Sequence, residues 1–211
     1  MKPAAVDEFF RRLAAEVPEP KTELNYVNPY TLLVAVVLSA QATDAGVNRA
    51  TAALFEKIKT PQQMVALGEV SLKEYIKTIG LFNAKAKNII ALSQRLVENF
   101  GGKLPRMRED LQSLPGVGRK TANVVLNVVY GEPTMAVDTH VFRVANRTGM
   151  APGKTPEQVE DRLVKLIPQQ WMAHAHHWLI LHGRYTCKAR VPLCSRCVVR
   201  DLCVFKDKTK V

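Results

Sequence analysis

The amino-acid sequence predicts an all-α protein. Apolar residues recur at helical spacing along almost the whole chain, and no stretch alternates apolar and polar residues as a half-buried strand does. Signals that start and stop helices are also frequent. The β-branched runs 34–37 and 124–129 lie inside longer windows bounded by such signals, which favours buried helices over strands. We expect about ten helices and no sheet.

The first expected helix buries one apolar face and ends before Pro18. The residues of that face are Val6, Phe9, Phe10 and Leu13. The pair Asn28-Pro29 then opens a second, buried helix over residues 30–38.

Three further helix starts have the signature of a capping box, in which Ser or Thr is followed three residues later by Glu or Gln. The boxes begin at Thr60, Ser71 and Thr155, and a proline at the first helical position strengthens the first and the third. Glycines are expected to end helices, because glycine readily adopts the left-handed conformation of a C-terminal cap. These glycines are Gly80, Gly101, Gly102, Gly131, Gly149 and Gly183.

The composition indicates a soluble, strongly basic protein of one or two domains. Of 211 residues, 47% are hydrophobic and 23% are charged. Lys and Arg number 30 against 19 Asp and Glu, which gives a net charge of +11 and an isoelectric point near 9.7. Such an excess is typical of a protein that binds a polyanion, and nucleic acid is the leading partner. A solvated basic tail remains the alternative for the charge around the C-terminal cysteines.

No membrane segment is expected. The longest apolar run, residues 32–38, is far too short to cross a bilayer. The N-terminal segment MKPAAVDEFF has acidic residues where a signal peptide would place its apolar part. We therefore expect a cytoplasmic protein.

The four cysteines of the chain lie close together near its end and predict a metal site. They are Cys187, Cys194, Cys197 and Cys203, spaced C-x6-C-x2-C-x5-C. Disulfides are disfavoured, because a chain of this length can bury a core without them and a pairing within C-x2-C would be strained. All-cysteine zinc sites usually combine two short C-x2-C pairs, and only one is present, so an iron-sulfur cluster is favoured over zinc.

A second informative segment, LPGVGRKTA at residues 114–122, predicts a helix, a glycine hairpin and a helix. Gly116 and Gly118 are expected to adopt positive φ and to let the backbone approach a ligand closely. The amide groups at the start of the second helix, which runs from about Arg119 to Tyr130, would then face an anion such as a DNA phosphate. The segment does not fit the phosphate-binding loops G-x-x-x-x-G-K-[ST] or G-x-G-x-x-G.

Together these motifs resemble the endonuclease III family of helix-hairpin-helix DNA glycosylases and abasic-site lyases. The LPGVGRKTA hairpin and the cysteine spacing match that family, as do VDTHV at 137–141, LSAQATD at 38–44 and HGR at 182–184. The resemblance extends from about Pro29 to the cysteines, and its motifs follow the family's order.

The resemblance implies a fold and a function. One helical domain would comprise residues 22–132, with the helix-hairpin-helix at about 108–130, and a second would combine 1–21 with 133–211 and carry the cluster loop at 187–203. DNA would lie in the cleft between them. The implied activity is removal of oxidised pyrimidines from double-stranded DNA, followed by β-elimination 3′ to the abasic site, by a nucleoid-associated monomer with a [4Fe-4S] cluster.

The family's catalytic lysine and aspartate correspond to Lys120 and Asp138. Lys120 falls in the first turn of its expected helix, where the positive end of the helix dipole disfavours an ammonium and favours a nucleophilic amine. Asp138 precedes a helical pattern and is expected to be an N-cap whose carboxylate stays ionised, and which acts as a base or stabilises positive charge on the sugar.

Other residues are implied to bind DNA. The damaged base must leave the duplex, and Gln41 and Leu81 match the family residues that fill the gap. His140 matches a residue near the active site, although it could simply bond to the backbone. The hairpin residues expected to contact DNA are Gly116, Val117, Gly118 and Thr121.

Two alternatives to this function stay open. An adenine-mismatch glycosylase would share the hairpin, the aspartate and the cysteines, but it would lack Lys120 and normally carry an extra C-terminal domain. A non-catalytic iron-sulfur module that binds DNA or carries electrons would make Lys120 and Asp138 incidental. Whether the cluster is structural or redox-active cannot be read from the spacing.

Overall fold

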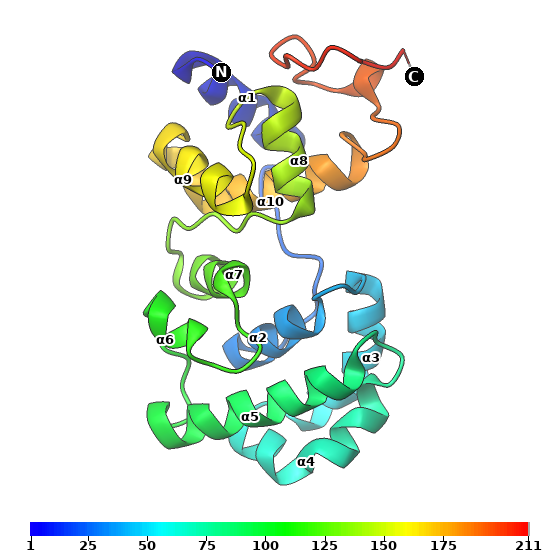
Figure 1. Ribbon diagram of the computed structural model, residues 1–211, viewed down its shortest axis with the longest axis vertical. Helices are drawn as coiled ribbons and strands as arrows, with labels where there is room; N and C mark the ends of the chain where they lie inside the picture. The colour runs from blue at the N-terminus through cyan, green and yellow to red at the C-terminus, as the bar shows by residue number, and fades with distance from the viewer. Residues whose placement is uncertain (211) are drawn as a thin grey trace. The chain divides into compact units, whose positions relative to one another are not determined.

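The computed structural model describes residues 1–210 and is entirely helical over that range (Figure 1). The all-α prediction is confirmed, and none of these residues forms a strand. The helices are α1 (Pro3–Glu16), α2 (Pro29–Leu38), α3 (Asp44–Lys57), α4 (Pro61–Ile76), α5 (Phe82–Phe100), α6 (Arg108–Gln112), α7 (Arg119–Tyr130), α8 (Thr139–Thr148), α9 (Pro156–Leu166) and α10 (Gln169–Tyr185), followed by the short 3-10 helix η1 (Cys194–Arg196).

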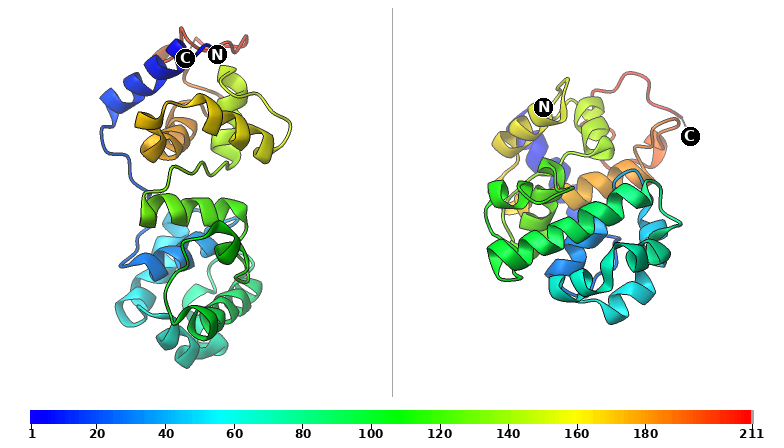
Figure 2. Two further views of the ribbon diagram at one scale, coloured as in Figure 1. Left: turned by 90° about the vertical axis from the view of Figure 1, so that its left-hand side faces the viewer. Right: turned by 60° about the horizontal axis from the view of Figure 1, so that its bottom comes forward.

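The chain folds into two compact units. We call Thr22–Tyr130 the hairpin unit, and Met1–Lys21 together with the chain from Gly131 onward the cluster unit. Both chain ends belong to the cluster unit (Figure 2). None of the helices in residues 1–210 combines the length and the apolar character that a bilayer crossing requires.

The hairpin unit is built around α2. Nine of the ten α2 residues are buried, because this helix is apolar on every side and contacts α3, α5 and α7. Its start is defined by a capping box in which Asn28 and Thr31 bond reciprocally, with Pro29 at the first helical position. The helices α4 and α5 pack along each other (Figure 1).

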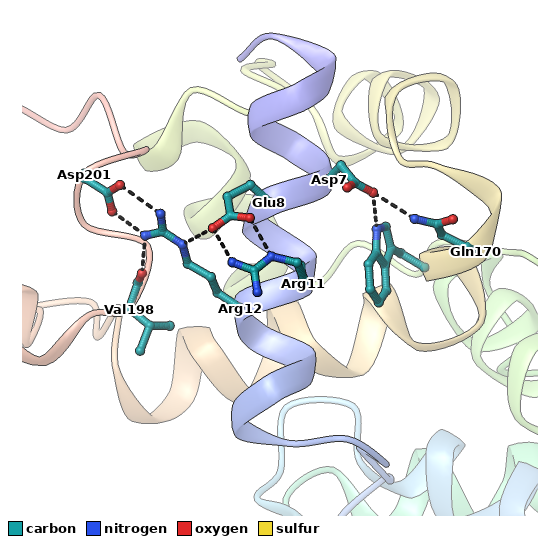
Figure 3. Close-up of polar contacts among 8 residues, drawn as sticks. Asp7, Glu8, Arg11, Arg12, Gln170, Val198 and Asp201 are labelled. Atoms are coloured by element: carbon teal, nitrogen blue, oxygen red, sulfur yellow. Dashed lines mark hydrogen bonds and ion pairs between the residues drawn. The ribbon is translucent and has the colours of Figure 1, made fainter.

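The cluster unit packs α1, α8, α9 and α10 around one apolar core. The expected face of α1 lies in that core, and Phe10 contacts the Trp178 ring of α10. Polar bonds also join α1 to distant parts of the chain (Figure 3). Arg12 Nη1 donates to Val198 O at 2.8 Å and pairs with Asp201 at 2.6 Å, so α1 contacts the segment that carries the cysteines.

Two expected helix boundaries are wrong. Ser71 does not cap a helix, because α4 continues through it; the break lies earlier, at Gly68, whose φ is 77° and ψ 163°. Gly183 does not end a helix either, since α10 runs on to Tyr185. A Cβ at Gly183 would lie 2.8 Å from His140 Cβ, so glycine at this position lets α8 and α10 pack closely.

Candidate functional site

The glycine hairpin lies between α6 and α7 and is anchored by two buried apolar side chains, Leu114 and Val117. The Val117 N–H donates to Leu114 O at 3.1 Å and closes the turn. Gly116 has a φ of 78°, and a Cβ there would lie 3.0 Å from the Asn88 Cβ of α5. Two features therefore favour glycine at this position: its left-handed conformation and its tight contact with Asn88.

Gly118 has a different role from the one expected. It does not adopt positive φ, so that part of the prediction is wrong. No atom lies within 4 Å of the position that its Cβ would take, and its carbonyl accepts the first bond of α7, from Ala122 N–H at 3.0 Å. A glycine here leaves the surface open at the start of α7, where a ligand can approach the backbone.

Lys120 and Thr121 are the second and third residues of α7. The Lys120 side chain is exposed and Thr121 is half-buried. The amides of a first helical turn have no acceptor within the helix, so an anion is favoured next to them. The structure thus places Lys120 in the first turn, as expected, with its amine accessible to a ligand.

Asp138 is the N-cap of α8. Its Oδ1 accepts hydrogen bonds from the N–H groups of His140 and Val141, both at 2.8 Å. Both bonds end on Oδ1, so the cap by itself leaves Oδ2 unused. The carboxylate lies at the N-terminus of α8, and the residue is only half-buried. A fixed negative charge accessible from outside can accept a proton or stabilise a cation.

The His140 side chain is oriented by an arginine. Arg143 Nη2 lies 3.1 Å from His140 Nδ1 and also donates to Gly183 O at 2.8 Å. Because a guanidinium only donates, Nδ1 is the acceptor and a neutral His140 ring carries its proton on Nε2. The half-buried ring therefore has Nε2–H as its remaining donor.

Gln41 and Leu81 occupy two turns of the hairpin unit and share an unusual backbone conformation. Their φ values are 54° and 60°, and they are the only residues other than glycine among 1–210 with positive φ. Both side chains are exposed, Leu81 by 62%. A Cβ on Gly80 would lie 4.0 Å from Gln41 O, so the two turns lie side by side. An exposed leucine held in a left-handed turn is costly, which is typical of a functional position.

The four cysteines form no disulfide, are half-buried and line one pocket of the cluster unit. His182 lies on its wall, with Nε2 3.7 Å from Cys197 Sγ. Burial raises the pKa of Cys197 to about 11 and also raises the pKa of Cys203. Thiols in such a place ionise when a metal replaces their protons.

The four cysteines supply an all-thiolate donor set inside one pocket. Four cysteine thiolates are the ordinary ligands of an iron-sulfur cluster and are also found around zinc. The residues present therefore fit the cluster that the sequence predicts.

Two arginines of α8 hold the start of the cysteine segment and were not predicted. Arg143 Nε donates to Cys187 O at 2.9 Å. Arg147 donates to Lys188 O at 2.6 Å and to Ala189 O at 2.7 Å. Their spacing of four residues places both arginines on one helix face, which is the one feature of the sequence that relates them. The sequence does not indicate their acceptors, which lie about forty residues away along the chain.

Comparison with known proteins agrees with this geometry. Residues 34–169 match the model of the HhH-GPD superfamily of base excision DNA repair proteins. The endonuclease III of Rickettsia conorii is 58% identical over 203 residues, covering 96% of this chain and 97% of its own. That of Escherichia coli K12 is 55% identical over 204 residues, covering 97% of both chains.

A solved structure agrees as well. A trapped covalent intermediate of endonuclease III with DNA has 43% sequence identity and a TM-score of 0.90, covering 97% of this chain and 96% of the solved chain. The resemblance expected from the motifs is thereby confirmed. The chain belongs to the endonuclease III family, within the HhH-GPD superfamily of base excision DNA repair proteins.

Proposed function

We propose that this protein is a bifunctional DNA glycosylase and abasic-site lyase of base excision repair that acts on oxidised pyrimidines. The observation that carries the proposal is its membership of the endonuclease III family over nearly the whole chain, with a lysine in the first turn of α7 and an aspartate capping α8. A 43% identical endonuclease III has been trapped in covalent linkage with DNA, and such a linkage requires a nucleophile.

In the proposed reaction, the Lys120 amine attacks the sugar C1′. The bond from C1′ to the base breaks, and the base leaves with the electron pair and gains a proton. Loss of a proton from nitrogen and opening of the sugar ring give an imine between Lys120 and C1′. Removal of a C2′ proton then expels the 3′ phosphate by β-elimination, and water releases the lysine.

Asp138 is proposed to act on the same deoxyribose. Its carboxylate, with Oδ2 outside the helix cap, is suited to stabilise positive charge at C1′ and to accept a proton from the amine. His140, with Nε2–H available, is proposed to donate to DNA nearby.

DNA binding is proposed to use two parts of the hairpin unit. The amides of Gly116 and Gly118 and the hydroxyl of Thr121 would bind a phosphate, with Val117 buried as the anchor of the turn. The exposed side chains of Gln41 and Leu81 would fill the gap left by the extruded base. Because the substrate is chromosomal DNA and one chain carries both catalytic residues, we expect a monomer acting at the cytoplasmic nucleoid.

The four cysteines are proposed to hold a [4Fe-4S] cluster. The cluster would fold the basic segment 187–203 and so shape a surface for the DNA backbone. The arginines at 143 and 147 would fix the start of that segment to α8, and Arg12 would fix it to α1.

Borohydride trapping tests the catalytic proposal. Duplex DNA with thymine glycol or an abasic site should give a reduced covalent adduct, and mass spectrometry should locate it on Lys120. Lys120→Ala should form no adduct, whereas Lys165→Ala, an exposed lysine of α9, should trap normally.

Three results would contradict this proposal. An adduct that persists in Lys120→Ala would refute the lysine assignment. Excision of adenine from mismatches without an adduct would indicate the monofunctional branch of the superfamily. Tight DNA binding without any excision would indicate a non-catalytic module.

A further inference from the structure

The C-terminal end of α2 leads directly into the Gln41 turn. Each of the last four carbonyl groups of α2 accepts a hydrogen bond. The Ser39 N–H donates to Ala35 O at 2.9 Å and the Ser39 hydroxyl to Val36 O at 2.8 Å. Two further backbone bonds follow, from Ala40 N–H to Val37 O at 3.4 Å and from Ala42 N–H to Ser39 O at 3.1 Å. The remaining carbonyl, that of Leu38, has no backbone donor among these bonds.

The donor to that carbonyl is a lysine of another helix. Lys85 Nζ lies 2.9 Å from Leu38 O. Lys85 is only 5% exposed, and among the described residues it forms no ion pair with a carboxylate. The Lys85 ammonium therefore lies at the C-terminal end of α2, the negative end of that helix dipole.

Lys85 is also bonded to the second turn. Its backbone N–H donates to Leu81 O at 3.0 Å, the first hydrogen bond of α5. One residue thus contacts the turn of Gln41 through its side chain and the turn of Leu81 through its backbone. A Cβ built on Gly80, next to Leu81 in the chain, would lie 4.0 Å from Gln41 O, so the two turns are neighbours.

A buried ammonium without a counter-ion is expensive for stability. Burial lowers the pKa of Lys85, which is the sign of that cost. Met has a similar unbranched stem and would fill the same space without a charge to desolvate. A lysine at this place therefore calls for a reason other than packing, and the bond to Leu38 O supplies one.

We propose that Lys85 is a positioning residue for base extrusion, which holds the Gln41 and Leu81 turns at a fixed separation so that both side chains enter the duplex together. This inference rests on the proposed function, in which these two side chains fill the gap in the DNA. Lys85 itself touches neither the reacting sugar nor the damaged base; it acts through the two turns.

Hydrogen exchange tests the structural half of the proposal. In Lys85→Met the amides of Ala40 and Ala42 should exchange about tenfold faster, since the turn loses one hydrogen bond at its base. Lys87→Met is the matched control, because it removes the same charge from an exposed position two residues along α5. That control should leave both amides unchanged. Equal exchange in the two variants would overturn the proposal.

Excision kinetics test the functional half. Lys85→Met should slow single-turnover excision from duplex DNA about tenfold relative to Lys87→Met, yet change trapping on a single-stranded abasic oligonucleotide by less than about twofold. In the Gln41→Ala/Leu81→Ala background, adding Lys85→Met should change the duplex rate by less than about twofold, because residues that act as one unit are not additive. All rates are measured below the melting temperature of the least stable variant. If Lys85→Met does not fold, Lys85→Gln replaces it, because this milder change removes the charge but keeps an N–H donor.

The outcomes separate this inference from the proposed function. One outcome is that the Gln41→Ala/Leu81→Ala protein excises slowly while Lys85→Met still adds its full effect. That result overturns only the positioning role of Lys85 and leaves the proposed function standing. Equal losses on single-stranded and duplex substrates do the same, because they indicate general damage to the fold. An unchanged duplex rate in Gln41→Ala/Leu81→Ala overturns the proposed gap-filling pair and this inference together.

Discussion

Asp138 caps α8 and is proposed to act in catalysis, and two substitutions separate the two roles. As the N-cap of α8 it accepts two hydrogen bonds on Oδ1, and in the proposed reaction its carboxylate would act on the sugar. Asn caps a helix about as well as Asp but carries no charge, whereas Ala does neither. Asp138→Asn should therefore keep the helix start and lose the chemistry, and Asp138→Ala should lose both.

The expected magnitudes follow from the cap. Replacing an N-cap Asp by Ala costs about 0.5 to 2 kcal/mol, and the two 2.8 Å bonds suggest a value of about 1 kcal/mol or more. For a chain of this size, about 1 kcal/mol lowers the melting temperature by about 2 to 4 °C. Loss of a group that moves or balances a proton lowers the excision rate by about 10² to 10⁴.

The assay is thermal unfolding by circular dichroism together with single-turnover excision of thymine glycol from duplex DNA. Asp138→Asn should melt within about 1 °C of the parent protein and excise at least about 10²-fold more slowly. Asp138→Ala should be as slow and melt at a lower temperature. Near-parental excision by Asp138→Asn would show that the residue is only a structural cap. Equal destabilisation of both variants would refute the capping argument.

Three further predictions concern the hairpin, the metal and acid stability. Gly116→Ala should weaken DNA binding, measured by fluorescence anisotropy, far more than Gly101→Ala. Both glycines have positive φ, but only at Gly116 would an added Cβ press against Asn88. Equal losses of affinity would argue against a hairpin contact with DNA. The purified protein should be brown and contain iron by elemental analysis, and a colourless, active, zinc-loaded protein would contradict the cluster. Burial lowers the pKa of His177 from 6.5 to about 4, so the unfolded chain binds this proton first as pH falls. Between pH 7 and 5 this histidine alone should lower the free energy of unfolding by about 2 kcal/mol. In urea titrations of His177→Leu, this contribution to the loss of stability should be absent. An unchanged pH dependence of stability in His177→Leu would refute the assignment of the effect to His177.

Local signals in the sequence determined most of the helices and the placement of the two proposed catalytic residues. Thr60 and Gln63 form the expected capping box, and Gly149 ends α8 with a φ of 72°. Lys120 falls in a first turn and Asp138 caps a helix, both as expected. These features depend on residues within one or two turns of each other, so the order of residues along the chain is enough to predict them.

Contacts between distant residues decided the rest. Gly183 was expected to end a helix, but it lies inside α10, where it packs closely against His140 of α8, about forty residues away in the sequence. The bond from Lys85 to Leu38 O and the bonds from Arg143 to the cysteine segment likewise join residues far apart in the chain. No periodicity or cap encodes such pairs, because they arise only when packed helices bring a donor and an unsatisfied carbonyl together.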